Sequence, residues 1–153
     1  MDAAKKAEKT NLNLDFLPDL VGYQLRLAQI AIFRDFSSTL GELDITPGLF
    51  GVLVIIEANA GLTQNALAKA THLDRSTVVT VIDKLEQRGL VERRAAVPDR
   101  RAYALVLTSA GTKLLKSLKT LVREHEKRLC KNFTSQERGQ LVDLLQRIFP
   151  ERR

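Results

Sequence analysis

A short helix that leads directly into two strands is the feature that most restricts how this chain can fold. Asp74 is a favourable N-cap and Gly89 suits the left-handed position just after a helix end, so residues 75–88 are predicted to be helical. Residues 90–94 and 102–107 have the composition of strands, and the segment between them contains a proline. We therefore expect the two strands to pair as a β-hairpin whose tip is exposed to solvent.

Two further helix starts precede this unit. Thr46 is followed by a proline at the first helical position, and Thr63 caps a segment that runs to Thr71. The turn of sequence His-Leu-Asp before the 75–88 helix has the length expected in a helix-turn-helix. Residues 46–108 are therefore predicted to form a winged helix-turn-helix, and the fold class is mainly α with a small β-hairpin as the wing.

The helix over 75–88 has one apolar and one polar face. Its first turn carries Arg75 and Thr77, while Ser76 and Thr80 lie on the polar face, flanked by Val79. An α-helix fits the major groove of B-DNA and meets base edges with its N-terminal residues, so this face is a candidate for DNA recognition. The alternative is an ordinary solvated face, because about half of any amphipathic helix is polar.

The segments on either side of this unit are predicted to hold two subunits together. Residues 1–13 have the composition of a flexible tail, and a helix begins near Asp15 with Pro18 in its first turn. This helix is apolar on most faces, and one chain of 153 residues would struggle to bury it. Further apolar residues at helical spacing follow the hairpin. We therefore assign residues 14–45 and 109–153 to a helical dimerisation region.

Charge and composition narrow the classes of function. The formal net charge is +6 and the pI about 9.7, which suits a polyanionic partner or simply a basic protein. No apolar run is long enough to span a bilayer and the first residues do not resemble a signal peptide, so we expect a cytoplasmic protein with no membrane partner. The sequence has no nucleophile–base pairing, glycine-rich phosphate loop or metal-ligand cluster, so we expect no enzyme activity, no cofactor and no metal.

The order of these motifs resembles the MarR family of bacterial transcriptional regulators. The resemblance rests on a helix-turn-helix followed by "RGLVER", then "DRR", then "LVLTSAG". It implies a homodimer in which the first and last helices of the subunits interlock. It also implies that each winged helix binds one half-site of a double-stranded DNA operator.

The resemblance further implies which residues contact DNA. Arg101 corresponds to the wing arginine that enters the minor groove, and Asp99 to the acid that holds it in place. Arg100 is implied at the tip or on phosphate. Arg93 and Arg94, at the base of the wing, are implied to touch phosphate or to face solvent, and we include Arg94 among the DNA contacts. The residues matched to the major groove are Arg75, Ser76, Thr77, Val79 and Thr80.

Members of this family commonly bind phenolic or aromatic acids, so the resemblance also implies a small-molecule effector. Tyr23, Arg26 and Arg34 on the first helix and Phe50 on the next supply aromatic and guanidinium groups. Such a set suits a ligand with a flat apolar body and a negative charge, such as an aromatic carboxylate or its coenzyme A thioester. The alternative for these four side chains is core packing or surface ion pairing.

Two other interpretations of the sequence remain open. A winged helix can serve as a protein-interaction module without binding DNA, although such a module has no need for paired arginines at its tip. Some members of the family are thiol redox sensors with a reactive cysteine in the first helix, whereas the single cysteine here, Cys130, lies late in the long helix after the hairpin. The predicted function is therefore a ligand-responsive DNA-binding repressor, with these two as alternatives.

Overall fold

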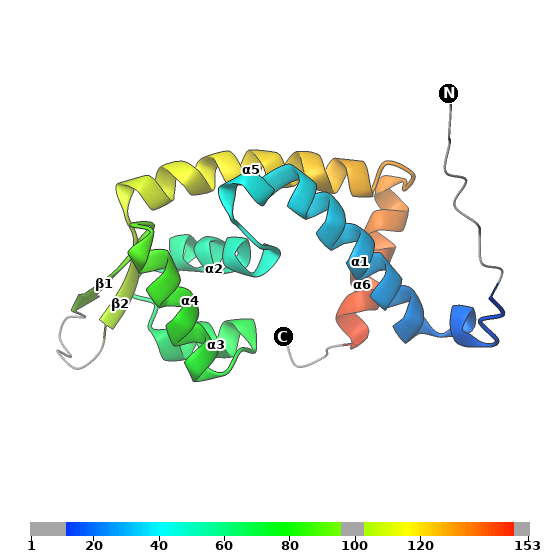
Figure 1. Cartoon of the computed structure of the whole chain (residues 1–153), viewed down its shortest axis with the longest axis horizontal. Helices are drawn as coiled ribbons and strands as arrows, with labels where there is room; N and C mark the ends of the chain where they lie inside the picture. Colours follow the sequence, from blue (N-terminus) through cyan, green and yellow to red (C-terminus); the bar gives the residue numbers. More distant parts are fainter. Residues whose placement is uncertain (1–11, 96–102, 149–153) are drawn as a thin grey trace, which may run out of the picture.

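The computed structural model describes residues 12–95 and 103–148, which form helices and one hairpin (Figure 1). The elements are η1 (Leu17–Asp19), α1 (Val21–Leu40), η2 (Gly41–Leu43), α2 (Pro47–Ala58), α3 (Gln64–Thr71), α4 (Arg75–Gln87), β1 (Val91–Ala95), β2 (Tyr103–Leu107), α5 (Ser109–Leu129) and α6 (Ser135–Ile148). Helices α2, α3 and α4 with the hairpin make a winged helix-turn-helix, which confirms the predicted fold class.

The helices of this unit begin where the sequence predicts. The side chains of Thr46, Thr63 and Asp74 each accept a hydrogen bond from a backbone N–H three residues later. Thr108, which follows the hairpin, caps α5 in the same way. Gly89, with φ of 67°, takes the left-handed conformation just after α4 and turns the chain into β1.

The start of the first helix differs from the prediction. Pro18 lies in the separate short 3-10 helix η1, and α1 begins only at Val21. Leu20 between them has extended backbone angles, φ −83° and ψ 126°, so the helical run is interrupted there. A proline in the first turn of either element is equally acceptable, and the sequence alone therefore did not reveal the break.

The core surrounds α2. Val52, Leu53 and Ile56 of this helix are buried, and it packs against α5, β2 and α3. The other fully buried side chains come from every element around it, namely Leu40, Leu67, Val78, Ile82, Leu85, Val91, Leu105, Leu115 and Leu118. The apolar face of α4 is therefore directed inward, and its polar face remains available to solvent.

The two strands pair only with each other in the described part of the chain. They are antiparallel, with Val91 opposite Leu107 and Arg93 opposite Leu105. The hairpin is attached to the helices through buried Val91 and Leu105, and the backbone N–H of Leu105 donates to the carbonyl of Leu62 at 2.8 Å. A two-stranded ribbon is only marginally stable alone, so these attachments determine where the wing lies.

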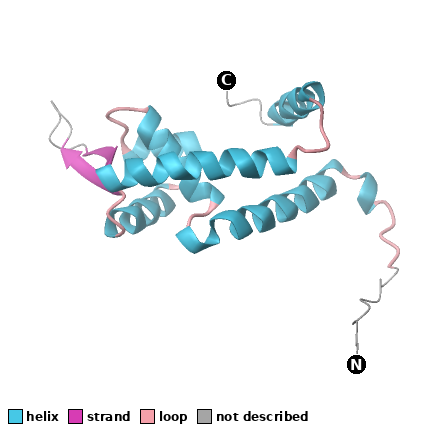
Figure 2. Ribbon diagram, turned by 90° about the horizontal axis from the view of Figure 1, so that it is seen from above, coloured by secondary structure: helices cyan, strands magenta, loops and turns pink. Residues whose placement is uncertain are grey.

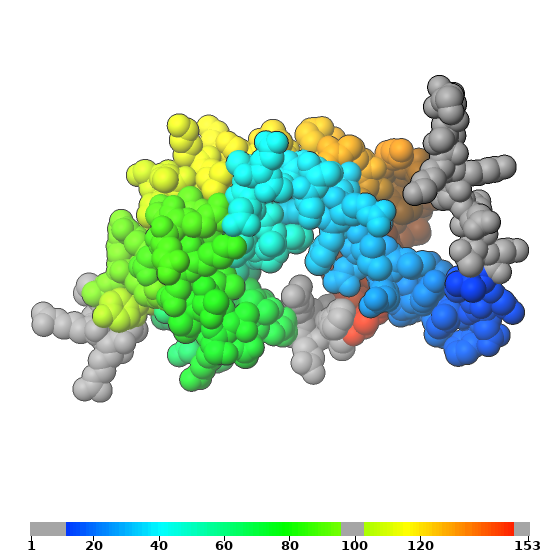
Figure 3. All heavy atoms as spheres, viewed as in Figure 1, coloured from blue at the N-terminus to red at the C-terminus, as the bar shows by residue number. Residues whose placement is uncertain are grey.

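Helices α1 and α5 run side by side, and α5 leads from the winged unit to α6 (Figures 1 and 2). The space-filling view shows η1 and the first half of α1 projecting beyond the winged unit, with a notch between the two parts (Figure 3). On α1 only Phe36 and Leu40 are buried, and α6 buries none of its residues. The outer part of the chain therefore exposes much apolar surface.

No single helix within the described ranges is long and apolar enough to cross a bilayer. The bent pair Val21–Leu43 and Pro47–Ala58, with 69° between its halves, passes the same test by length and composition alone.

Candidate nucleic-acid interface

The first turn of α4 is held by a dense set of hydrogen bonds to Asp74. Its carboxylate accepts from the Ser76 hydroxyl at 2.5 Å, and from the backbone N–H and the hydroxyl of Thr77, both at 2.8 Å. These bonds lower the pKa of Asp74 to about 2. The bond from Ser76 contributes most to this shift, followed by the N–H and then the hydroxyl of Thr77. Asp74 is therefore ionised at neutral pH, and the start of α4 is rigidly defined.

The outward face of α4 combines a cation, hydroxyl groups and one apolar side chain. Arg75, Ser76, Val79 and Thr80 are exposed, whereas Val78, Ile82 and Leu85 on the opposite face are buried. Val79 keeps 43% of its surface exposed on a helix whose other large apolar residues face the core or lie half-buried. An exposed valine beside hydroxyls suits contact with thymine methyl groups and base edges.

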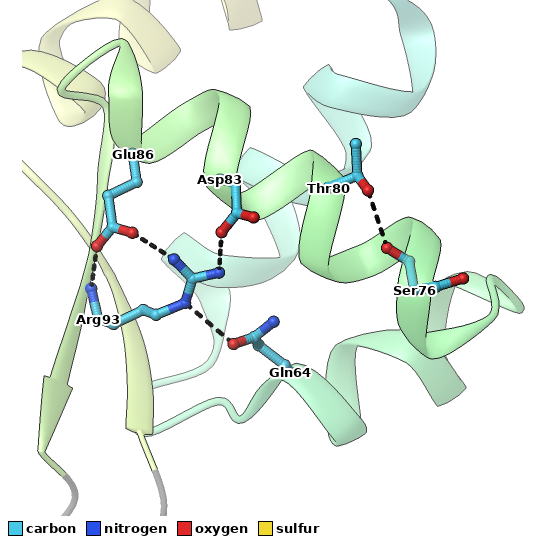
Figure 4. Close-up of polar contacts among 6 residues, drawn as sticks. All are labelled: Gln64, Ser76, Thr80, Asp83, Glu86 and Arg93. Atoms are coloured by element: carbon cyan, nitrogen blue, oxygen red, sulfur yellow. Dashed lines mark hydrogen bonds and ion pairs between the residues drawn. The ribbon is translucent and has the colours of Figure 1, made fainter.

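The hydroxyl hydrogens on this face are directed to partners within the helix. Thr80 donates to the backbone carbonyl of Ser76 at 3.1 Å (Figure 4), and Ser76 donates to Asp74. Each hydroxyl therefore presents lone pairs outward and is arranged to accept hydrogen bonds, for example from exocyclic amino groups of bases. Thr77 is half-buried and its hydroxyl belongs to the cap, so it differs from its exposed neighbours.

Helix α3 packs against α4 through a short turn. His72 in this turn has φ of 55°, a left-handed conformation that ends α3, and Asp74 begins α4 two residues later. The abrupt change of direction brings the start of α4 to the outer surface of the winged unit. This is the arrangement that places a second helix in the major groove in helix-turn-helix proteins.

The two arginines at the base of the wing have different surroundings. The guanidinium of Arg94 is exposed and pairs with Glu92 of the same strand. The side chain of Arg93 is only 19% exposed and donates to Asp83 and Glu86 of α4 and to Gln64 of α3 (Figure 4). Arg93 therefore neither faces solvent nor points outward to a phosphate. The wing-tip residues Asp99, Arg100 and Arg101 lie outside the described residues.

The four predicted effector residues lie on α1 and α2. Tyr23 is half-buried on α1, Arg26 and Arg34 of the same helix are exposed, and Phe50 is half-buried against the core. A cavity of about 280 Å³ lies where α1 meets α2, lined by Phe33, Ser37, Gly41, Asp44, Ile45, Thr46 and Pro47. A second, of about 530 Å³, lies between α5 and α6, lined by Val122, Arg123, Glu126, Lys127, Cys130, Phe133, Thr134, Ser135 and Arg138. Neither includes any of the four.

A polar cluster that the sequence did not reveal joins α1 to α5. The imidazole Nδ1 of buried His125 lies 2.5 Å from an oxygen of Asp35, and its ring packs edge-on against Phe36. Arg128 donates to the same carboxylate at 3.0 Å. Hydrogen bonds from His125 and then Arg128 hold the pKa of Asp35 below its usual range. The position of His125 on the apolar side of its helix was the only sequence signal for this cluster.

Cys130 is half-buried at the end of α5. Its sulfur lies 3.8 Å from an oxygen of Glu126. Among the described residues, no three histidine, cysteine, aspartate or glutamate side chains are grouped so that they could hold a metal ion.

Comparison with known proteins supports a regulatory role for this architecture. The sequence model of the MarR family matches residues 43–102. A protein from Thauera aromatica, whose name assigns it to transcriptional regulation of the hcr operon, is 39% identical over 130 residues, which are 84% of this chain and 78% of the relative. The multiple antibiotic resistance protein MarR of Escherichia coli is 32% identical and covers 76% of this chain and 82% of its own length.

Solved structures with the same fold include complexes with DNA and with a thioester. The transcriptional repressor CouR bound to a 23-mer DNA duplex superimposes with a TM-score of 0.86 at 35% identity, covering 91% of this chain and 99% of CouR. CouR bound to p-coumaroyl-CoA gives a TM-score of 0.82 at 34% identity, covering 90% of this chain and 96% of CouR. A MarR mutant from E. coli complexed with operator DNA superimposes with a TM-score of 0.80 at 28% identity, covering 91% of this chain and 100% of the mutant chain.

Proposed function

The chain belongs to the MarR family of DNA-binding transcriptional regulators, and we propose that it is a homodimeric repressor released from its operator by a small-molecule effector. In this proposal residues 46–108 bind DNA, and residues 14–45 and 109–153 join two subunits in the cytoplasm. Neither an enzyme activity nor a cofactor is part of it.

The observation that carries the DNA-binding surface is the exposed first turn of α4. Its ordered cap presents Arg75 and the acceptor lone pairs of Ser76 and Thr80 beside the apolar surface of Val79. In the proposed complex these side chains face the major groove, with Thr77 supporting the turn from within. Exposed Arg94 contacts phosphate, and Arg101, oriented by Asp99 and flanked by Arg100, enters the minor groove.

The proposed homodimer rests on apolar surface that one subunit leaves uncovered. The exposed large apolar residues from the start of η1 through α1 are Leu17, Leu20, Val21, Leu25, Leu27, Ile30, Ile32 and Phe33, and those of α6 are Leu141, Val142, Leu144, Leu145 and Ile148. Single exposed apolar residues are common on proteins, but a run of this extent marks an interface. A second copy that packs against both helices would bury it. Two recognition helices would then read half-sites about 10 base pairs apart.

The proposed effector is an aromatic carboxylate or its coenzyme A thioester. CouR, which resembles this chain along most of its length, has been solved with p-coumaroyl-CoA. Tyr23 and Phe50 can supply apolar contact, and Arg26 and Arg34 can pair with the negative groups. A hundredfold loss of DNA affinity needs a coupling of about 2.7 kcal/mol between the sites, which is in the usual range for allosteric proteins.

The DNA-binding part is tested by operator affinity at about 150 mM salt, a concentration that must be fixed because phosphate contacts weaken as salt rises. We expect Arg101→Ala to cost about 1–3 kcal/mol of binding free energy. Lys131→Ala is the matched control, because it removes a positive charge from the α5–α6 turn, at the opposite end of α5 from the hairpin (Figure 1). If Arg101→Ala binds as tightly as Lys131→Ala, the wing does not contact the groove.

The effector part is tested by the same assay with aromatic acids and their thioesters. We expect added ligand to release wild-type protein from DNA, and Arg26→Ala or Tyr23→Ala to require a higher concentration. An absence of any response at millimolar ligand excludes this ligand class. A wild-type response in both variants places the site elsewhere.

A further inference from the structure

The side chain of Arg93 connects three elements that must be aligned when the protein binds DNA. It extends from β1, and its Nε donates to the side-chain oxygen of Gln64 at the start of α3, at 3.0 Å. One terminal nitrogen pairs with Glu86 and the other donates to Asp83 at 2.6 Å, and both carboxylates belong to α4 (Figure 4). A carboxylate oxygen of Glu86 also accepts from the backbone N–H of Arg93 at 3.3 Å.

This network lies where the wing needs an attachment. Val91 is buried, Arg93 is half-buried on the same face of the strand, and the next two residues, Arg94 and Ala95, are exposed. The hairpin has no third strand among the described residues, and a two-stranded ribbon does not fix its own direction. The planar guanidinium, with donors in three directions, can fix the angle between β1 and α4 more tightly than an apolar contact could.

The charge balance separates this role from direct DNA contact. Arg93 brings one positive charge against two carboxylates, so its surroundings are net negative and do not attract a phosphate. The side chain is 19% exposed, compared with 65% for Arg94 on the neighbouring position of the strand. Arg94 is therefore placed to meet a phosphate, and Arg93 is placed to hold the strand.

We propose that Arg93 is a positioning residue that locks the wing to the recognition helix α4 through Glu86 and Asp83, so that both elements dock on DNA as one rigid unit. The inference rests on the proposed function, because it assumes that the wing contributes to binding. Disturbing a coupling of this kind changes affinity by about 2- to 30-fold, and we expect Arg93→Ala to weaken operator binding within that range.

Glu86→Gln provides the decisive measurement. Removal of a negative charge close to the DNA-binding helix should tighten binding to a polyanion if charge alone matters. If Arg93 acts through Glu86, the same substitution weakens binding. The combination of Arg93→Ala with Glu86→Gln then binds no worse than Arg93→Ala alone, because the second change removes a contact that is already lost.

Glu92→Gln is the matched control. It removes a carboxylate from the same strand, but from the pair with exposed Arg94 and not from the network of Arg93. We expect it to bind the operator at least as tightly as wild type. All affinities are measured at a temperature at which circular dichroism shows every variant to be folded, and each is corrected for the active fraction by stoichiometric titration with operator DNA.

The inference is overturned if Glu86→Gln binds as tightly as wild type or more tightly, because the contact between Arg93 and Glu86 would then contribute nothing to DNA binding. It is also overturned if Arg93→Ala binds as wild type after correction for the active fraction, since its role would then be confined to stability. Arg101→Ala is measured in parallel. If it weakens binding and Arg93→Ala does not, only this inference fails; if neither weakens binding, the proposed wing contact fails as well.

Discussion

Replacing Gly111 with alanine should separate the start of α5 from the wing. Gly111 is buried in the first turn of α5, where a Cβ atom would lie 2.0 Å from the carbonyl oxygen of Leu90 and 2.9 Å from its carbonyl carbon. Ordinary contacts to a Cβ begin at 3.4 Å, so the two backbones must move apart by about 1.4 Å. The same Leu90 oxygen accepts a hydrogen bond from the N–H of Thr108 at 3.1 Å, which this movement would break.

The magnitude follows from three contributions. Overpacking a closely fitted site costs about 1–3 kcal/mol, and a lost hydrogen bond about 1 kcal/mol. Alanine regains about 0.8 kcal/mol of helix propensity relative to glycine. The net loss for Gly111→Ala is therefore about 1–3 kcal/mol, which lowers the melting temperature by about 2–4 °C per kcal/mol in a chain of this size.

The assay is urea unfolding followed by far-ultraviolet circular dichroism, at one protein concentration because association affects apparent stability. Gly51→Ala in α2 is the control, because a Cβ atom there meets nothing within 4 Å. We expect this variant to be as stable as wild type or more stable by up to about 1 kcal/mol. If Gly111→Ala unfolds at the same urea concentration as Gly51→Ala, the contact between α5 and Leu90 is not a tight constraint and the reasoning is refuted.

Three further predictions concern other parts of the chain. The pKa of Asp74 lies at about 2, below the usual 3.8, so its ionised form stabilises the fold above about pH 4. The stability advantage of wild type over Asp74→Asn should therefore shrink as the pH falls from about 4 to about 2. An advantage that is independent of pH in urea titrations would contradict this. Arg88 donates to the carbonyls of Leu43 and Asp44, both at 2.8 Å, so Arg88→Ala should lower the free energy of unfolding by about 1.5–3 kcal/mol. Lys84→Ala, which removes only an exposed partner of Asp44, should cost less than about 1 kcal/mol, and equal losses in the two variants would show that the backbone contacts of Arg88 add nothing. Cys130→Ser should bind the operator and respond to peroxide as wild type does, whereas oxidant sensitivity that disappears with the sulfur would favour the redox interpretation.

The caps of the helices were readable from the sequence because a cap involves residues at most three positions apart. Asp74 with Thr77, Thr108 with Gly111 and Thr134 with Glu137 follow this spacing, and all three pairs are hydrogen-bonded. Periodicity likewise identified the buried face of α4, because residues one turn apart share a face whatever packs against them. The exposed residues of α4 could thus be selected as candidates before any tertiary contact was known.

The sequence by itself determined the caps at which α2, α3, α4 and α5 begin and the apolar face of α4, but not the break at Leu20 before α1. The tertiary structure decided which side chains meet across elements, since periodicity specifies a face but not its neighbour. Arg93 contacts Gln64, which is 29 positions away in the sequence, and His125 contacts Asp35, which is 90 positions away. Gly111 is required because α5 crosses the chain at Leu90, a close approach that no local pattern encodes. Arg93 and Arg94 are adjacent arginines on one strand. Packing against α3 and α4 gave Arg93 its contacts within the protein and left Arg94 exposed.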